Sequence, residues 1–253
     1  MKTIGIIGGL GPMATVYYLE LITRMTDAVR DQEHPRVLLA SLPDTPDRTS
    51  YILWKKGMAG HAEDPFPVML KAALGLREMG AELLSVPCIT AHYFYDDLVR
   101  QLDIPVVHLP RCVAQDAAAK GIRQVGLLAT SGTIQSQVLE AEFAAAGIRV
   151  LVPDAARQKQ VMQIIYEQLK KGAPIQWESF YDVALSLQEQ GAEKLILGCT
   201  ELPLLRRNMA EVAGTKIEHV LAQDCVDVLE VLAQHVIREA GVPLRAEYRD
   251  VIQ

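Results

Sequence analysis

The sequence contains only four cysteines, and they are widely separated along the chain. None belongs to a C-x-x-C pair, and none has histidine partners at the spacing of a zinc site. This excludes the common cysteine-based zinc motifs, and we expect no metal at the functional site. The pattern favours a reduced, cytoplasmic setting, in which thiols are free to take part in chemistry.

Long apolar runs and basic runs are also missing. No stretch has the length of about 20 uncharged residues that a membrane-spanning helix needs. The apolar residues 4–7 resemble the start of a signal peptide, but glycines and a proline interrupt them at 8–12 and no cleavage site follows. Lys and Arg form no cluster, and the net charge of −6 argues against a broad nucleic-acid surface. We therefore expect a small-molecule partner rather than a membrane or a nucleic acid.

The composition is that of a globular protein. Of the 253 residues, 50% are hydrophobic and 22% are charged. A chain of this length can bury one large core or the cores of two domains of ordinary size.

Short apolar segments alternate with helix-patterned segments along the chain. This alternation predicts parallel sheets with helices on both faces. The expected strands are residues 3–7, 36–40, 83–86, 104–108, 123–130, 149–154 and 195–198. The expected helices are residues 13–29, 67–79, 134–146, 158–171, 177–190 and 221–240, and residues 41–49 are expected to form an irregular loop.

The two halves of the chain repeat one another. The tripeptide Gly-Ala-Glu occurs at residues 80–82 and 191–193, and each copy begins eight residues before a cysteine, Cys88 or Cys199. We therefore predict an α/β fold of two pseudo-symmetric lobes, with the active site in the cleft between them. The first lobe takes residues 1–116 together with the returning segment 221–253, and the second takes residues 117–220.

Cys88 and Cys199 each follow an apolar strand and precede small or hydroxyl-bearing residues. A thiol at such a junction faces backbone N–H groups and the positive end of a helix, which lower its pKa from about 8.5 toward neutrality. Two such thiols on opposite sides of a cleft suggest proton exchange at a stereocentre, because one can remove a proton while the other donates one to the opposite face. Cys112 and Cys225 lie in helix-patterned segments and are expected to be buried hydrophobic residues.

Other groups of the same loops are candidates for holding a substrate. Thr90, Thr200 and the backbone N–H groups of the cysteine loops can hold a carboxylate and the developing charge of a carbanion. Arg48 lies in a loop rich in proline, aspartate and threonine, where its guanidinium fits a carboxylate. The glycine loop at residues 8–12 loosely fits a dinucleotide fingerprint, but the ribose-binding acid expected after the next strand is missing. We therefore interpret this loop as an anion-binding loop for a carboxylate.

The motifs of these loops resemble one known family. They are Ile-Ile-Gly-Gly-Leu-Gly-Pro-Met-Ala-Thr at residues 6–15, Pro-Asp-Arg-Thr at 46–49, Pro-Cys-Ile-Thr-Ala-His at 87–92 and Gly-Cys-Thr-Glu-Leu at 198–202. Together they resemble the aspartate/glutamate racemase family over nearly the whole chain. The resemblance implies racemisation of an acidic amino acid without pyridoxal phosphate or another cofactor, commonly in a homodimer. It also implies that Cys88 and Cys199 are the two acid/base residues.

The resemblance also assigns roles to several other side chains. Arg48 is similar to the family's arginine near a substrate carboxylate, and Lys170 resembles the family's lysine in the same role. Ala91, Met13 and Glu201 complete the candidate substrate-binding set. Met13 is expected to line or close the cleft, and Glu201 is either a carboxylate favoured by the start of a helix or a ligand group.

One position departs from the family pattern. The family usually has Asn directly after the first cysteine, and this chain has Ile89. A backbone N–H contact from position 89 can persist, but a side-chain amide contact cannot, and such a loss weakens binding about tenfold or more. His92, four residues after Cys88, is expected to be a hydrogen-bonded structural histidine.

Three functions are compatible with these observations. The leading hypothesis is a racemase acting on aspartate or glutamate. An alternative enzyme is another cysteine-dependent isomerase, or a decarboxylase, of small dicarboxylates on the same scaffold. A second class is a non-catalytic amino-acid-binding relative, which Ile89 favours and the presence of both Cys88 and Cys199 disfavours.

Overall fold

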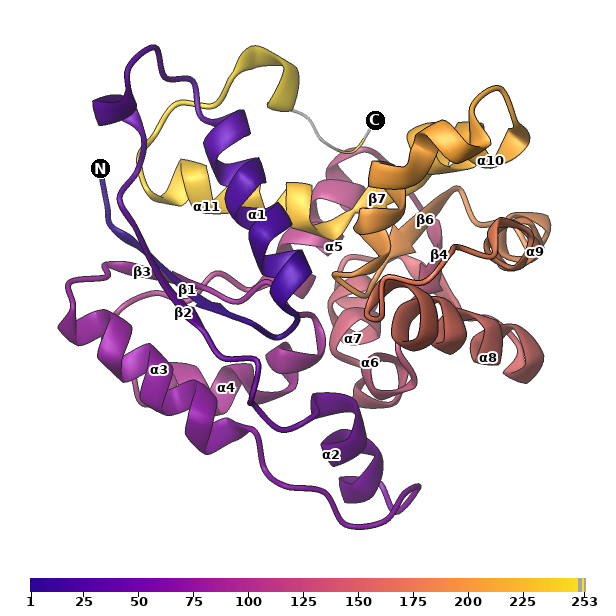
Figure 1. Cartoon of the computed structure of the whole chain (residues 1–253), viewed down its shortest axis with the longest axis horizontal. Coiled ribbons are helices and arrows are strands. Elements are labelled where there is room, and N and C mark those ends of the chain that lie inside the picture. The colour runs from indigo at the N-terminus through magenta and orange to yellow at the C-terminus, as the bar shows by residue number, and fades with distance from the viewer. Residues whose placement is uncertain (250–251, 253) are drawn as a thin grey trace.

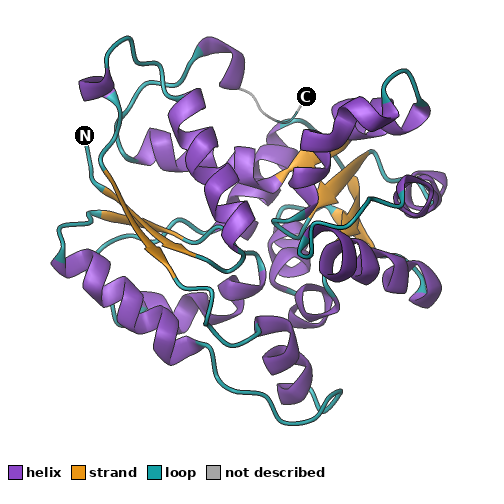
Figure 2. Ribbon diagram, viewed as in Figure 1, coloured by secondary structure: helices purple, strands orange, loops and turns teal. Residues whose placement is uncertain are grey.

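The computed structural model describes residues 1–249 and 252, and it contains two parallel β-sheets, one in each lobe. The first sheet has the order β2-β1-β3 and the second the order β5-β4-β6-β7. Figures 1 and 2 show the two sheets side by side, each covered by helices. This confirms the predicted α/β fold of two lobes. The strands are β1 (Ile4–Gly8), β2 (Val37–Ser41), β3 (Leu83–Ser85), β4 (Gln124–Leu128), β5 (Arg149–Leu151), β6 (Lys194–Leu197) and β7 (Cys225–Asp227).

The central strands form because apolar residues occupy consecutive positions, which suits a sheet buried on both faces. All residues of β1 and β3 are buried, and β6 is buried from its second residue onward. The α-helices around the sheets are α1 (Pro12–Met25), α2 (Arg48–Lys55), α3 (Phe66–Glu78), α4 (Tyr95–Val99), α5 (Leu109–Ala119), α6 (Ser131–Ser136), α7 (Val138–Ala145), α8 (Ala155–Gln163), α9 (Trp177–Glu189), α10 (Lys216–His219) and α11 (Val228–Glu239). Tighter 3₁₀ turns cover Asp31–Glu33, Thr90–Phe94, Leu202–Val212 and Ala246–Tyr248, and wider π turns cover Ile164–Leu169 and Val220–Asp224.

Residues 104–108 do not form the fourth strand that their pattern predicts. Val106 makes a single parallel bridge with Leu84 of β3. Two hydrogen bonds hold the segment there, from Leu84 N–H to Pro105 O at 2.8 Å and from Val107 N–H to Leu84 O at 2.9 Å. Pro105 has no N–H to donate, so the ladder does not extend.

The predicted helix at residues 134–146 is interrupted. It begins earlier, because the hydroxyl of Thr130 accepts a hydrogen bond from Thr133 N–H and caps α6. It then breaks at Gln137, whose φ of 59° lies in the left-handed region, so α7 starts as a separate helix.

Two other helices begin at positions that the sequence does not predict, because aspartates cap them. Asp154 accepts hydrogen bonds at the start of α8, so the helix expected at residues 158–171 begins at Ala155 and ends in the π turn Ile164–Leu169. Asp47 caps α2 in the same way, so the loop expected at residues 41–49 already contains the start of a helix.

The segment at residues 221–240 is not one continuous helix. Its residues Cys225–Asp227 form β7, which pairs with β6 in the second sheet. The helix α11 begins afterwards, because the Asp227 carboxylate accepts hydrogen bonds from the N–H groups of Leu229 and Glu230. The division of the chain at residues 220 and 221 stays a prediction, and β7 lies on the C-terminal side of it.

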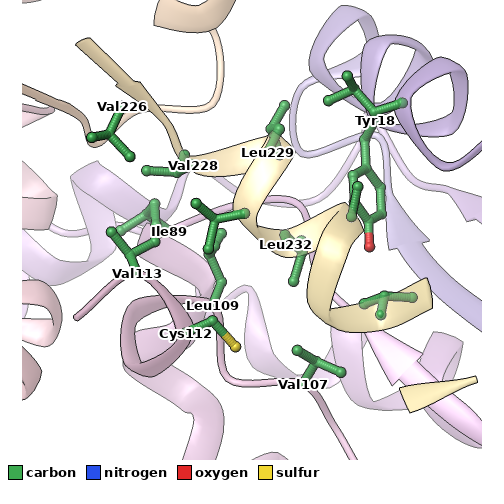
Figure 3. Packing of buried hydrophobic residues seen from close by; sticks show 14 of the residues in the cluster. Tyr18, Ile89, Val107, Leu109, Cys112, Val113, Val226, Val228, Leu229 and Leu232 are labelled. Carbon is green, nitrogen blue, oxygen red and sulfur yellow. The ribbon is translucent and has the colours of Figure 1, made fainter. Parts of the chain in front are cut away.

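Helix α11 returns to the first lobe, where it packs against α1 and α5. One continuous hydrophobic cluster includes Ile4 of β1, Val125 of β4 and Leu232 of α11. Figure 3 shows Leu229 and Leu232 of α11 beside Tyr18 of α1 within this cluster. The two lobes therefore share a core, which fixes their strand ends relative to each other.

Candidate active site

The carboxyl ends of strands from both lobes border one narrow, buried cavity, as is usual for parallel sheets. Loops after β1, β2 and β3 reach it from the first lobe, and loops after β4 and β6 reach it from the second. Its lining residues are Leu10, Asp47, Arg48, Thr49, Cys88, Ile89, Thr90, Thr130, Thr133, Tyr166, Lys170, Gly198, Cys199, Thr200 and Glu201. The cavity therefore receives one cysteine from each lobe.

Gly9 shapes the loop that carries Leu10 to the cavity. Its φ is +82°, and a Cβ at this position would lie 2.2 Å from the backbone nitrogen of Leu42. The Gly9 N–H donates to Thr15 Oγ1 at 2.8 Å, and the Thr15 hydroxyl donates to Gly11 O at 2.9 Å. Thr15 is thus a structural residue that fixes this loop.

The thiol of Cys88 lies beside a hydroxyl and a guanidinium. Cys88 is 4% exposed, and its Sγ lies 3.4 Å from Thr90 Oγ1. Burial by itself lowers the pKa of the neighbouring Arg48, but the negative charges of Cys88, Asp47 and Glu201 outweigh it and raise that pKa. Arg48 therefore remains a cation next to Cys88.

The thiol of Cys199 faces a carboxylate instead. Its S–H donates to Glu201 Oε2 at 2.9 Å, and Glu201 Oε1 lies 3.6 Å from Lys170 Nζ. Burial, and after it the charge of Glu201, raise the pKa of the Cys199 thiol well above its usual range, although Lys170 opposes them. The predicted lowering of the pKa is therefore wrong for Cys199, because the thiol is buried and an anion lies against the sulfur.

Arg48 also ties together the loops that surround it. Its Nη1 donates to Pro46 O at 3.1 Å and to Thr45 O at 3.3 Å, and its Nη2 donates to Leu10 O. The buried Nε–H finds no hydrogen-bond partner among the residues that the structure describes. Arg48 therefore donates three hydrogen bonds to backbone carbonyls, while its Nε–H stays without a partner.

Lys170, and not its neighbour Lys171, lies at the cavity. Its Nζ is 4.5 Å from the centre of the Tyr166 ring, whereas the Lys171 side chain is 63% exposed. Burial lowers the pKa of Lys170, but the charges of Glu201 and Cys199 outweigh it and raise the pKa. Lys170 is thus a second cation of the cavity wall, with its side chain 29% exposed.

The other candidate binding residues divide into two groups. Ile89, Thr90 and Thr200 line the cavity. Ala91 does not, because its side chain is buried in the hydrophobic cluster of the first lobe. Met13 is 52% exposed and lines an adjoining outer cavity rather than the one that holds the cysteines. The two cavities share Leu10, Asp47, Arg48, Lys170 and Glu201.

His92 has the structural role expected of it. Its Nδ1 lies 2.9 Å from Cys88 O, and its Nε2 accepts a hydrogen bond from Leu109 N–H at 3.2 Å. Burial lowers the pKa of His92 to about 4, so the ring is neutral and donates from Nδ1. Cys112 and Cys225 are buried as predicted, although Cys225 lies in β7 rather than in a helix.

Several cavity residues were not among the predicted binding residues. Thr49 donates a hydrogen bond to Thr130 Oγ1 at 3.0 Å, and Thr130 Oγ1 lies 3.2 Å from Thr133 Oγ1. Tyr166 donates to Asp47 Oδ2 at 3.4 Å. The threonines follow strands at the ligand edge, so their place in the sequence was a usable signal, whereas Tyr166 lies in a helical turn and gave none.

The described residues offer no obvious place for a metal ion. Nowhere in residues 1–249 and 252 do three or more His, Cys, Asp or Glu side chains gather in a way that could hold one. The same part of the chain has no helix long and apolar enough to cross a membrane.

The fold and the cavity define a two-lobed α/β protein in which each lobe supplies a cysteine to one shared site. Residues 7–236 match the model of the Asp/Glu/Hydantoin racemase family. The chain belongs to this family and is a racemase-like enzyme, an isomerase.

The similar proteins agree with this assignment. The aspartate racemase of Picrophilus torridus is 28% identical, covers 100% of both chains and superposes with a TM-score of 0.80. An aspartate racemase homologue from Pyrococcus horikoshii OT3 is 27% identical over 95% of this chain and 100% of its own, with a TM-score of 0.72. The broad specificity amino-acid racemase RacX of Bacillus subtilis (strain 168) is 24% identical over 208 residues, which cover 79% of this chain and 85% of RacX.

Proposed function

We propose that this protein racemises aspartate or glutamate by proton transfer between Cys88 and Cys199, without pyridoxal phosphate. The observation that carries the proposal is that the two thiols, one from each lobe, line the same cavity as the cations Arg48 and Lys170. The similarity to the Picrophilus torridus aspartate racemase, which extends over the whole chain, supports the choice of an acidic substrate.

The proposed reaction balances with two thiols and no other reagent. One cysteine, as a thiolate, takes the α-proton from one face of the substrate and becomes a thiol. The other, as a thiol, gives its proton to the opposite face of the planar carbanion and becomes a thiolate. The configuration at the α-carbon inverts, and the reverse reaction uses the same pair with exchanged roles.

The cavity also contains groups suited to the carboxylates of such a substrate. The unused Nε–H of Arg48 and the ammonium of Lys170 supply positive charge. The 3₁₀ turns Thr90–Phe94 and Leu202–Val212 begin at the two cysteine loops, and the first N–H groups of such turns have no partner within the turn. These donors stabilise the negative charge that develops on the α-carboxylate as the proton leaves.

A second candidate is racemisation of a wider range of amino acids. Ile89 lines the cavity but packs its side chain into the hydrophobic core, so this position supplies no side-chain amide of the kind that the family usually has. This feature favours a less polar substrate side chain, and the similarity to the broad specificity racemase of Bacillus subtilis gives it further support. The cysteine-dependent isomerase or decarboxylase of small dicarboxylates is the alternative enzyme. The non-catalytic binding protein has less support, because it requires neither thiol.

The test is proton exchange in deuterated water. The protein is incubated separately with both enantiomers of aspartate, glutamate and a set of neutral amino acids, and α-deuterium and optical activity are followed together. We expect deuterium incorporation and racemisation of at least one acidic amino acid. A Cys112→Ala variant is a suitable control, because Cys112 is a buried thiol outside the cavity. Absence of exchange with every amino acid contradicts the proposal.

We also propose that the protein is a homodimer. The family resemblance supports this state, and the exposed side chains of Met13 and Val16 on α1 offer apolar surface for such a contact. Sedimentation equilibrium distinguishes the dimer from a monomer of 27.9 kDa.

A further inference from the structure

The two thiols of the cavity have neighbours of opposite charge. The Arg48 guanidinium lies beside Cys88. The Glu201 carboxylate accepts the hydrogen bond of the Cys199 S–H at 2.9 Å. Cys88 and Cys199 are 4% and 8% exposed, so water does little to reduce these charge effects. The pseudo-symmetry of the lobes therefore does not extend to the charges around their cysteines.

Glu201 is held in this position from three sides. Its Oε2 accepts from Cys199, and its Oε1 lies 3.6 Å from Lys170 Nζ. Oε1 is buried and accepts no hydrogen bond from any residue described. Its third neighbour is the glycine loop of the first lobe, because a Cβ built on Gly11 would lie 2.5 Å from Oε1.

Gly11 is required there for space and not for its backbone conformation. Its φ of −114° and ψ of 157° are extended values that any residue adopts. Glycine at position 11 thus leaves room for the carboxylate that reaches across from the other lobe. This gives part of the glycine loop a role that its sequence pattern does not indicate.

We propose that Glu201 keeps the proton of the resting enzyme on Cys199, so that Cys199 starts as the acid and Cys88 starts as the base. A carboxylate against a buried sulfur disfavours the thiolate, because two negative charges would then lie at hydrogen-bond distance. The cation Arg48, by contrast, lies beside Cys88. The enantiomer whose α-proton faces Cys88 is therefore the one that the resting enzyme accepts directly.

The other charged groups around Cys88 and Cys199 support this assignment of base and acid. Lys170 is the cation nearest to Glu201, and it is already paired with that carboxylate. The other ionisable groups that line the cavity are Tyr166, whose pKa burial raises to about 12, and Asp47, which faces Tyr166 and Arg48. Tyr166 is thus neutral near neutral pH and adds no negative charge beside Glu201.

The preference of the resting enzyme for one enantiomer rests on the proposed racemase function. Whether the proton lies on Cys199 can be tested without any substrate. Iodoacetamide alkylates thiolates, and mass spectrometry of peptides reports each cysteine separately. In the wild type we expect Cys88 to be alkylated at a lower pH than Cys199. Cys112 and Cys225 serve as internal references, because burial raises the pKa of each to about 12.

Two variants test the Glu201 carboxylate. One is a substitution of Glu201 itself, in the second lobe, and the other is a substitution of Gly11, in the first lobe. Glu201→Gln removes the charge and keeps the shape, and we expect the alkylation rate of Cys199 at fixed pH to rise about tenfold or more while that of Cys88 changes little. Gly11→Ala displaces the carboxylate, and the same direction of change is expected. Glu230→Gln is the matched control, because Glu230 is also a partly buried carboxylate paired with a cation, Arg206 at 3.1 Å, and it does not line the cavity.

Three results overturn the inference. The first is a wild-type protein in which Cys199 reacts before Cys88. The second is a folded Glu201→Gln variant, with an unchanged thermal midpoint, in which Cys199 reacts no faster than in the wild type. The third is an equal rise of Cys199 reactivity in Glu230→Gln, since this would indicate general loosening rather than loss of the Glu201 charge. Failure of racemisation with the expected alkylation pattern would count against the proposed function alone.

Discussion

The hydroxyl of Thr49 donates a hydrogen bond to the hydroxyl of Thr130 at 3.0 Å, and this bond joins the two lobes at the wall of the cavity. Thr49 lies in the first turn of α2, and Thr130 caps α6. Gly132 lies against the same contact, because a Cβ there would be 2.6 Å from Thr49 Cα. The ends of two short helices therefore meet closely where the thiols from both lobes must face one substrate.

We expect Gly132→Ala to reduce catalysis more than it reduces stability. The added methyl group meets backbone atoms, which cannot turn aside, so α2 and α6 must move apart and the two halves of the cavity lose their alignment. The expected loss in kcat/KM is about 100-fold, measured by the racemisation assay beside a thermal melt. Gly75→Ala in α3 is the control, because a Cβ there meets no described atom within 4 Å. Equal activities of the two variants would contradict this prediction.

Arg48→Lys tests the joint role of Arg48 in holding loops and providing charge. An ammonium keeps the charge but cannot reach the carbonyls of Leu10, Thr45 and Pro46 together. Because hydrogen bonds to charged groups contribute about 1.5–3 kcal/mol each, we expect kcat/KM to fall about 10- to 100-fold and the thermal midpoint to drop. The exposed Arg100→Lys should change neither. Wild-type kinetics in Arg48→Lys would show that charge alone is sufficient.

Ile89→Asn restores the amide that the family usually has at this position. The amide can donate to or accept from a polar substrate group, so we expect KM for an acidic amino acid to fall about tenfold. The thermal midpoint should fall as well, because Ile89 is 2% exposed and part of the hydrophobic core. Ile89→Leu conserves volume and should leave KM unchanged. An unchanged or higher KM in Ile89→Asn would favour the wider substrate range.

Glu230 makes the stability of the fold depend on pH. Burial, and after it the neighbouring Asp227, raise the pKa of Glu230 from 4.5 to about 7 in the folded protein, although Arg206 opposes them. A raised folded-state pKa means that the folded protein binds the proton more tightly, so this contribution is fully present below pH 4.5 and is lost as the pH rises to about 7. Glu230→Gln should therefore gain stability relative to the wild type across this window, measured by urea denaturation at several pH values. A constant difference between the two proteins would contradict the assignment.

The architecture and the pair of thiols could be predicted because they depend on patterns that repeat. Cys88 and Cys199 follow matched apolar strands, and parallel strands end at the same edge of a sheet. The strand β7 could not be predicted, because Cys-Val-Asp is short and lies within a segment whose apolar spacing also fits a helix. Likewise, Pro105 removes a donor from an otherwise convincing strand.

The charges at the site were harder to predict than its residues. Glu201 was a candidate, but its contact with the Cys199 sulfur depends on how the chain turns after β6 and on the space left by Gly11. Those are tertiary features that spacing does not encode. The same holds for Ala91, which belongs to the motif yet faces the core, and for Met13, which lies in the outer cavity.

The most direct test of the central claim uses Cys88→Ala and Cys199→Ala in deuterated water, with each enantiomer of the substrate supplied separately. If the thiols act on opposite faces of one α-carbon, each variant should lose racemisation and retain α-deuterium exchange with only one enantiomer. The two variants should prefer opposite enantiomers. Racemisation at the wild-type rate in either variant, or exchange of the same enantiomer by both, would contradict the account.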